Sequence, residues 1–340
     1  MLQEIREQPV ALARTLKSEL AAIVKLRKYL ETHRPRLVVL AARGTSDNAA
    51  QFGRYLIEIS TGIPVSLAAP SVHTLYRAPV NMADTLVIGV SQSGESTDVN
   101  FVLERAKEQG AFTIGVTNES ESTLARLADQ TIQVRAGKEK SVAATKTYTG
   151  QLLAMYLIAW ALGADLKLKD LEKLPDLAAQ ALRLEKQVAE RCVRYHYMER
   201  AVVVGRGLNY ANAFEMALKL METCYVVAER FSSADLLHGP IAMVERTFPA
   251  FLFAPSGVTW KAVSETLTKL QSLHAETFVI SDKSNKEVSK PDLQLPMKLN
   301  ELYTPIPYII PAQLFAAHLA AEKGLNPDQP RALSKVTQNI

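Results

Sequence analysis

The sequence predicts an α/β protein made of two similar halves, each with a parallel sheet flanked by helices. Apolar runs of strand length alternate with longer segments of helical period. The two halves also align with each other at one constant offset, which indicates an internal duplication. Hydrophobic residues make up 48% of the 340 residues, enough for a sizeable core, and this length favours two domains over one.

In the first half, each strand-length apolar run is followed by a segment with helical period. The predicted pairs of strand and helix are 37–41 with 48–59, 85–90 with 98–109, and 112–116 with 122–128. This repeating order is typical of a parallel sheet. Segment 149–161 is rich in Leu, Ala, Met and Tyr and predicts a long buried helix. The charged, Leu-rich stretch 165–190 is the predicted connection, and the run 201–204 opens the second half.

The duplication is seen at two loops. Arg43-Gly44 and Arg206-Gly207 each follow an apolar strand and precede a helix, and they lie 163 positions apart. The same offset places SQSGES at 91–96 over APSGVT at 254–259, so only the first copy has a hydroxyl-rich loop. The predicted boundaries are a helical segment at 1–30, a first domain at 31–170, a second domain at 171–322 and a C-terminal tail at 323–340.

Composition and charge narrow the class of protein. The 39 Lys and Arg residues against 35 Asp and Glu give a net charge of +4 without a basic block, so nucleic acid is not an expected partner. Cys192 and Cys224 have no CxxC spacing, and reduced thiols that bind no metal are expected. The N-terminus lacks a signal-peptide pattern, and the most apolar run, 152–162, is too short to span a bilayer. We therefore expect a cytoplasmic protein with no membrane segment, metal or other cofactor.

The loop at 91–96 has the residues of an anion site. Ser91, Ser93 and Ser96 surround Gly94 after a buried strand and before a helix, where hydroxyls and free backbone amides can bind an anion. The loop has no lysine, unlike nucleotide-binding P-loops, which favours a monophosphate. Ser46, after the first strand, is expected beside the same crevice. Helix capping is the alternative role for these serines.

Several motifs together resemble one protein family. GTS at 44–46, SQSGES at 91–96 and AGKEKSVAATKTYTGQ at 136–151 resemble the sugar isomerase (SIS) domain family, in particular the isomerase module of glucosamine-6-phosphate synthases. The resemblance covers essentially the whole chain. It implies two tandem SIS domains, each a five-stranded parallel sheet in a flavodoxin-like three-layer sandwich. It further implies a phosphosugar substrate, contacted by Ser46, Ser91, Gln92, Ser93 and Ser96, with a backbone contact from Val142.

Glu215, Lys219 and Glu222 are spaced to share one face of a helix. An ordinary ion pair on a solvated face is the alternative role for such a set. The rest of the helix is largely apolar, so the charged stripe is expected to face a water-filled cleft. Interconverting a 2-amino aldose with its 2-keto form requires moving a proton between adjacent carbons. Glu222 is the predicted proton shuttle, Lys219 would move the oxygen proton, and Glu215 would position Lys219.

Two further catalytic candidates follow from the resemblance. His238 matches the family's LxHGP motif, whose histidine assists ring opening and reaches into the neighbouring subunit's site, so a homodimer is implied. Lys335 lies in the tail sequence DQPRALSKVT, where the family's lysine contacts the open-chain sugar and can form a Schiff base. The adjacent Ser334 is expected to contact the substrate as well. A structural histidine and a solubilising tail lysine are the alternatives.

The predicted reaction is the deamination of glucosamine 6-phosphate to fructose 6-phosphate and ammonia. The synthases hydrolyse glutamine with a cysteine at the mature N-terminus, whereas this chain starts Met1-Leu2 and has no cysteine before Cys192. Deamination needs only water, and the tail resembles that of stand-alone SIS-type deaminases. The alternatives are a related isomerase or deglycase acting on another aminated sugar 6-phosphate, and a non-catalytic sugar-phosphate sensor. The absence of a helix-turn-helix segment and the full ionisable set disfavour the sensor.

Overall fold

The computed structural model describes residues 1–333, which divide by their contacts into two compact units. The first unit consists of Val10–Glu139 and Lys146–Lys173, and the second of Met1–Pro9, Lys140–Thr145 and Leu174–Leu333. Each unit is built on a parallel sheet of five strands, so the predicted fold class is confirmed. The boundaries predicted at residues 30, 170 and 322 stay predictions.

The first unit is built on a sheet whose strand order reverses between β1 and β3. Its strands are β1 (Leu37–Ala42), β2 (Val65–Leu67), β3 (Thr85–Val90), β4 (Phe112–Thr117) and β5 (Gln130–Gln133). They are parallel and lie in the order β2-β1-β3-β4-β5. Open α/β sheets bind ligands outside the carboxyl ends of their strands, at the point where the order reverses. The loops that follow β1 and β3, both predicted to contact phosphate, start at this point.

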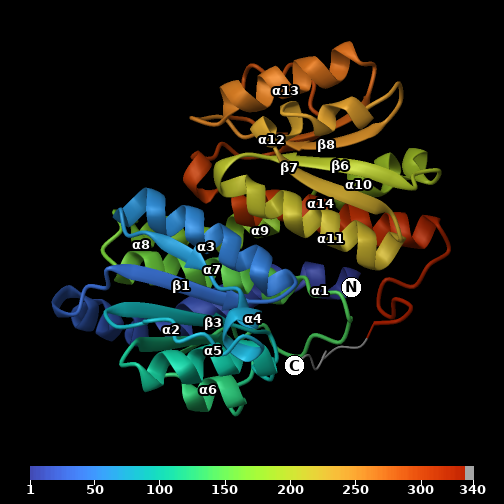
Figure 1. Ribbon diagram of the computed structural model, residues 1–340. Coiled ribbons are helices and arrows are strands. Elements are labelled where there is room, and N and C mark those ends of the chain that lie inside the picture. Colours follow the sequence, from blue (N-terminus) through green and yellow to red (C-terminus); the bar gives the residue numbers. More distant parts are fainter. Residues whose placement is uncertain (334–340) are drawn as a thin grey trace. The chain divides into compact units, whose positions relative to one another are not determined.

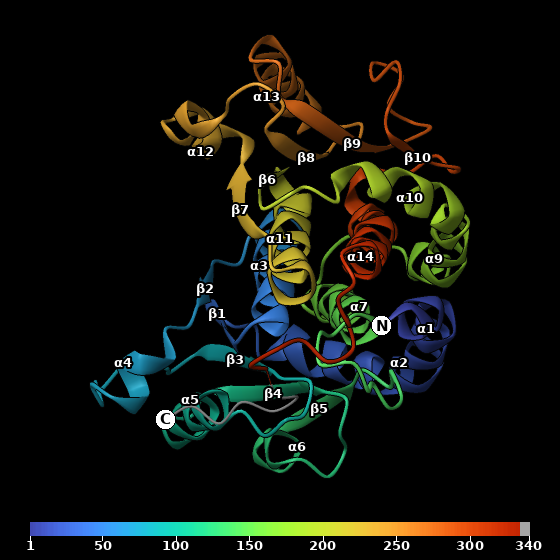
Figure 2. The ribbon, with the colours of Figure 1, turned by 90° about the vertical axis from the view of Figure 1, so that its right-hand side faces the viewer.

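Helices cover both faces of the first sheet (Figure 1). They are α2 (Gln8–Thr32), α3 (Thr45–Thr61), α4 (Pro70–Thr74), α5 (Thr97–Glu108), α6 (Thr123–Leu127), α7 (Lys146–Ala161) and α8 (Leu168–Leu171). Helices α3 and α7 lie on one face and α5 and α6 on the other, as Figure 2 also shows. Because both faces are covered, every residue of β3 is buried. The predicted buried helix at 149–161 is α7, which begins earlier, at Lys146. All residues of α7 are buried except Trp160, which is partly exposed.

The second unit repeats this topology. Its strands are β6 (Arg200–Gly205), β7 (Val227–Ser232), β8 (Pro249–Phe253), β9 (Glu276–Asp282) and β10 (Leu293–Leu295). Their order, β10-β9-β8-β6-β7, is the order of the first sheet when β6 is matched to β1. The internal duplication inferred from the 163-residue offset is therefore present in the fold.

Helices flank the second sheet in the same three-layer arrangement. The α-helices are α1 (Leu2–Arg6), α9 (Leu174–Leu182), α10 (Glu185–Cys192), α11 (Tyr210–Cys224), α12 (Ser233–Leu237), α13 (Trp260–Ser272) and α14 (Pro305–Glu322). The 3-10 turns are η1 (Val193–Tyr195), η2 (Gly207–Asn209), η3 (Pro240–Met243) and η4 (Glu301–Tyr303). Helices α12 and α13 lie on one face of the sheet, and α11 and α14 on the other (Figures 1 and 2). On the second face, Phe251 of β8 packs edge-on against Phe315 of α14, with ring centroids 5.0 Å apart.

The connection at 165–190 is three short helices, α8, α9 and α10, and not one continuous helix. Pro175 lies in the first turn of α9, where a residue without a backbone N–H is tolerated but cannot continue a preceding helix. Among the helices formed by residues 1–333, none combines the length and the apolarity that crossing a bilayer requires.

Candidate active site

The loop between β3 and α5 is fixed by a glycine that no larger residue can replace without rearrangement. Gly94 has φ +67°, and a Cβ added to it would lie 2.1 Å from the Ser122 hydroxyl oxygen. The Gly94 N–H donates to the Ser91 hydroxyl at 3.1 Å. Its carbonyl accepts from Asn100 Nδ2 at 3.1 Å and from the Leu124 N–H at 3.0 Å. The loop therefore has one well-defined shape before any ligand binds.

The polar side chains of this loop make hydrogen bonds within the loop and to α6. The Ser93 hydroxyl accepts from the Glu95 N–H at 3.2 Å, so it keeps its own proton to donate. Glu95 itself caps α6: its carboxylate accepts from the Thr123 N–H at 2.9 Å and from the Thr123 hydroxyl at 2.8 Å. Both hydrogen bonds lower the pKa of the Glu95 carboxyl, and the one from the Thr123 backbone has the larger effect. The Glu95 carboxylate is thus hydrogen-bonded to the first residue of α6.

The loop after β1 is tied to the loop after β3. Arg43 Nε lies 2.5 Å from Asp98 Oδ2, and the Ser96 hydroxyl donates to the other oxygen of Asp98 at 2.9 Å. Ser46 is buried in the first turn of α3 and accepts from Gln151 Nε2 at 2.8 Å. The structure therefore places the predicted phosphate contacts of β1 and β3 at one edge of one sheet.

Glu139 is a residue of this site that the sequence did not single out. Its buried carboxylate accepts from the Lys146 N–H at 2.9 Å and the Thr147 hydroxyl at 2.7 Å, at the start of α7. The same carboxylate accepts from Gln92 Nε2 at 2.7 Å, which fixes this amide in the loop at 91–96, here named the phosphate loop for its predicted role. No local pattern marks this role, because the Gln92 contact spans 47 positions of the chain.

Helix α11 carries the three ionisable residues predicted for catalysis. Lys219 Nζ lies 2.5 Å from Glu222 Oε2 and 3.5 Å from Glu215 Oε1. The side chains of Glu215 and Lys219 are 0% exposed, and that of Glu222 is 23% exposed. The stripe expected to face water is thus mostly buried, and only its Glu222 end reaches solvent. Buried charges of this kind need opposite charges beside them, and here each is close to one.

His238 lies apart from this stripe, and Val142 belongs to the same second unit. His238 is exposed directly after α12, which flanks the sheet on the face opposite to α11 in both ribbon views (Figures 1 and 2). The N–H of Val142 donates to the Asp328 carbonyl at 3.2 Å, and the predicted backbone contact of Val142 with a ligand stays a prediction. Ser334 and Lys335, the predicted contacts in the tail, lie outside the described residues.

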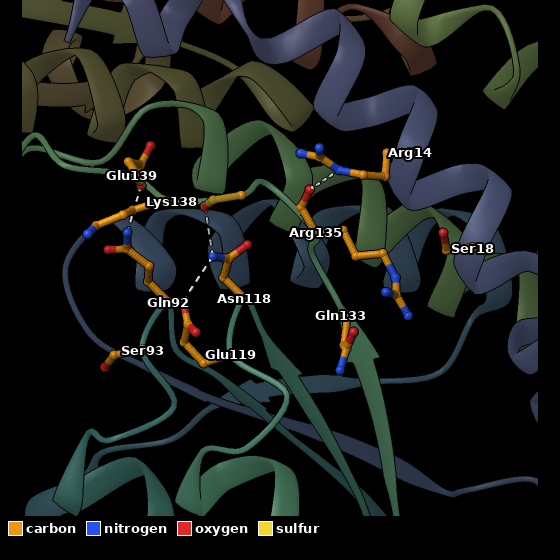
Figure 3. A pocket seen from close by; sticks show the side chains of 11 residues that line it. Arg14, Ser18, Gln92, Ser93, Asn118, Glu119, Gln133, Arg135, Lys138 and Glu139 are labelled. Carbon is orange, nitrogen blue, oxygen red and sulfur yellow. Dashed lines mark hydrogen bonds between the residues drawn. The ribbon is translucent and has the colours of Figure 1, made fainter.

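A cavity of about 770 Å³ adjoins the phosphate loop in the first unit (Figure 3). It opens at the carboxyl ends of β3, β4 and β5 and is lined by Arg14, Ser18, Gln92, Ser93, Asn118, Glu119, Gln133, Arg135, Gly137, Lys138 and Glu139. Two of the predicted phosphate contacts, Gln92 and Ser93, are among these residues. In the described part of the chain, no group of three or more His, Cys, Asp or Glu side chains is arranged to hold a metal ion.

The fold and the site together define a duplicated flavodoxin-like α/β protein with a serine-rich loop after β3 in its first copy and an ionisable helix in its second. Residues 32–161 and 196–323 each match the SIS domain. The chain belongs to the SIS domain family, as its motifs indicated.

Known proteins are similar to this one along nearly the whole chain. The glutamine–fructose-6-phosphate aminotransferase [isomerizing] of Aquifex aeolicus is 36% identical over 98% of this chain and 57% of its own length. The chain thus spans little more than half of that relative. The C-terminal domain of glucosamine-fructose-6-phosphate aminotransferase from Francisella tularensis is 29% identical, with a TM-score of 0.89 over 97% of this chain and 98% of that one. Glucosamine-6-phosphate deaminase from Thermotoga maritima, 22% identical, shares the fold with a TM-score of 0.82, covering 99% of both chains.

Proposed function

We propose that this chain is a phosphosugar isomerase-type enzyme that deaminates glucosamine 6-phosphate. The observation that carries the proposal is the group of Glu215, Lys219 and Glu222 on α11, in which a partly exposed carboxylate is paired with a buried ammonium. Family membership and the 36% identity to an isomerizing fructose-6-phosphate aminotransferase support a phosphosugar as the substrate. The same turns of α3, the corresponding helix of the first unit, carry Phe52, Leu56 and Ile59, so the charged group is specific to one copy.

The phosphate would be held at the reversal point of the first sheet. The hydroxyls of Ser91 and Ser93 and the start of α5, whose N-cap is Ser96, provide donors for it, with Ser46 beside them. Because Glu95 is bound to α6 and Gln92 to Glu139, the loop offers these donors in a fixed arrangement. Preorganised donors bind an anion without a cost for ordering the loop.

The chemistry requires one proton to move between two carbons. In the open-chain amino aldehyde, the Glu222 carboxylate would remove the proton on C2 and return it to C1, while Lys219 supplies a proton to the oxygen on C1. The product of this transfer is a protonated imine at C2 of the ketose chain. The proton that Lys219 supplied returns to it when the protonated imine is hydrolysed. Water adds to C2, ammonia leaves, and fructose 6-phosphate remains, so glucosamine 6-phosphate and water balance the two products.

Two further groups would complete the site. His238 is exposed and on the opposite face of its sheet from α11, which supports a role in the site of a neighbouring subunit. There it would assist opening of the sugar ring. Lys335 would donate hydrogen bonds from its ammonium group to the carbonyl end of the open-chain sugar, without a covalent bond. A homodimer with shared sites follows from this assignment of His238.

Deamination is proposed over amination because the tail sequence DQPRALSKVT resembles that of stand-alone SIS-type deaminases. The sequence has two cysteines, Cys192 and Cys224, and burial raises the pKa of each thiol to about 11. A nucleophilic thiol needs a pKa near or below neutral pH. Neither Cys192 nor Cys224 is therefore proposed as a nucleophile.

Purified protein incubated with glucosamine 6-phosphate tests the proposal. Equal amounts of ammonia and fructose 6-phosphate are expected, each measured by a coupled enzymatic assay. Interconversion of an aldose and a ketose 6-phosphate without ammonia release from any aminated sugar would refute deamination and leave an isomerase. Tight binding of phosphosugars with no turnover of any of them would refute an enzyme and favour a sensor.

A further inference from the structure

The start of the C-terminal tail is held against the second unit by two sets of contacts. The first set comes from the segment just before α7. The Ser141 hydroxyl donates to the Pro327 carbonyl at 3.3 Å, and the Val142 N–H donates to the Asp328 carbonyl at 3.2 Å. Residues 140–145 and 174–333 belong to the same compact unit. The path of the tail is therefore fixed within this unit before the tail reaches its second set of contacts.

The second set of contacts comes from Tyr225. The Tyr225 hydroxyl oxygen accepts from the Arg331 N–H at 2.9 Å, and the Arg331 guanidinium carbon lies 4.0 Å from the centroid of the Tyr225 ring. A cation at this distance over an aromatic face is attracted to it. Figure 1 shows the tail after α14 passing the end of α11 from which β7 starts. One side chain thus binds both the backbone and the side chain of one tail residue.

Tyr225 has a backbone conformation that tyrosine rarely adopts. It is the C-cap of α11, with φ +55° and ψ +31°, in the left-handed region that favours glycine. Its N–H donates to the Leu220 carbonyl, which ends the helix. Glycine would adopt the same conformation without strain. Strained residues cluster at functional sites, and the contact of this side chain with the tail is the feature that a glycine would lack.

The position of this contact links the tail to the proposed catalytic group. Tyr225 follows Glu222 by three residues, at the end of α11. Arg331 precedes Lys335, the group proposed to bind the carbonyl end of the sugar, by four residues. Both partners in the contact are therefore close in sequence to groups assigned to the reaction.

We propose that Tyr225 is a positioning residue, which holds the tail at the end of α11 and so keeps Lys335 within reach of the substrate. The inference rests on the proposed function in taking Lys335 as a group that contacts the sugar. In this role Tyr225 acts only through Arg331 and touches no reacting atom. Without the contact, the tail would be docked for a smaller fraction of the time, and turnover would fall with that fraction.

Loss of the contact should lower kcat more than it raises KM. The phosphate of the substrate is assigned to the phosphate loop, which belongs to the other unit. Lys335 would instead donate to the carbonyl end of the open-chain sugar, where charge changes as the proton moves. An interaction that strengthens during the reaction affects kcat, whereas one that binds substrate and transition state equally affects KM.

Steady-state kinetics of ammonia release from glucosamine 6-phosphate test the proposal. Tyr225→Gly loses both contacts with Arg331 and relieves the strained backbone, so it should remain folded by circular dichroism. Its kcat should fall about tenfold and its KM should stay within about twofold, since one cation–π contact and one hydrogen bond are lost. Tyr225→Phe keeps the ring and should retain part of the lost activity.

A double-mutant cycle and a matched control separate this contact from a general effect on α11. Arg331→Gln should lower kcat in the wild type and have little further effect in Tyr225→Gly, because the two side chains act as a pair. The control, Arg230→Gln, removes a guanidinium that lies 5.0 Å from the ring centroid of Phe214 on the same helix. This control should keep the wild-type kcat.

Limited digestion with trypsin measures the contact independently of the reaction. Trypsin cleaves after arginine, and cleavage after Arg331 requires this residue to leave Tyr225. The rate of cleavage then follows the fraction of undocked tail. Tyr225→Gly should be cut at this position about tenfold faster than wild type, and Arg230→Gln at the wild-type rate, as measured by mass spectrometry of the whole chain.

The two measurements distinguish the possible failures. Equal cleavage rates in wild type and Tyr225→Gly would overturn the contact, and faster cleavage with an unchanged kcat would overturn the positioning role. A wild type that releases no ammonia from any aminated sugar phosphate would refute the proposed function alone, because the cleavage rates would still decide whether Tyr225 holds the tail. Faster cleavage together with a lower kcat would support the proposal.

Discussion

Replacing Gly94 by alanine tests how tightly the phosphate loop is held. The residue has φ +67°, and its added Cβ would lie 2.1 Å from the hydroxyl oxygen and 2.4 Å from the Cβ of Ser122. Ser122 is the N-cap of α6, where its hydroxyl accepts from the Ala125 N–H at 3.3 Å and donates to the Glu119 carbonyl at 2.8 Å. Alanine must therefore displace a residue that begins the next helix.

Two terms make up the expected loss of stability. The left-handed backbone costs alanine about 1–2 kcal/mol relative to glycine. The collision with Ser122 adds about 1–3 kcal/mol, as overpacking usually does. Gly110 separates the two terms, because it has φ +81° and nothing within 4 Å of an added Cβ. Gly110→Ala should show the backbone term alone.

Urea unfolding of the variants gives the difference between these terms. Gly94→Ala is expected to lose about 1–3 kcal/mol more than Gly110→Ala. In a Ser122→Gly background, which removes the colliding side chain, Gly94→Ala should cost about the same as Gly110→Ala. Equal losses for both glycines in the wild-type background would refute the close approach of Gly94 to Ser122.

Three further results are expected. Burial raises the pKa of the Cys192 and Cys224 thiols to about 11. A colourimetric thiol reagent near neutral pH should therefore label neither cysteine until the protein is unfolded. Labelling in the native state would contradict the burial of these thiols. Hydrogen bonds from Thr123 lower the pKa of the Glu95 carboxyl in the folded protein. The free energy by which wild type is more stable than Glu95→Gln should therefore be full above the reference pKa of 4.5 and vanish as the pH falls through the lower pKa of the folded state. A stability difference that persists in acid would count against these hydrogen bonds. Mixing inactive His238→Ala and Glu222→Gln proteins under subunit exchange should restore about a quarter of the activity if dimers share their sites, and none if they do not.

The strands that the sequence predicted are those with continuous apolar runs. Strands β1, β3 and β4 were found because helices cover both of their faces, which leaves no polar positions to interrupt the pattern. Strands β2 and β10 have three residues each, too few for a period to show. Strand β5, at an edge of its sheet, reads QTIQ and is only partly buried, so it lacked an apolar run as well.

The site was predictable where its residues are local in sequence. The loop around Gly94 and the spacing of the charged residues on α11 can both be read within a few positions. The helical period shows that Glu215 and Lys219 share a face with Glu222, but it does not show that this face is buried. The contact of Glu139 with Gln92 depends on the fold, which brings the start of α7 to the carboxyl end of β3.

The central claim is that the Glu222 carboxylate moves a proton on a bound amino-sugar phosphate, and one substitution tests it directly. Glu222→Gln keeps the volume and polarity of the side chain and removes the base. Ammonia release from glucosamine 6-phosphate should fall about 10²–10⁴-fold, the usual contribution of a general base, while calorimetry shows near-normal binding of the sugar phosphate. The matched control, Glu229→Gln on the exposed side of β7, should retain wild-type turnover. Wild-type turnover in Glu222→Gln would contradict the assignment of the base.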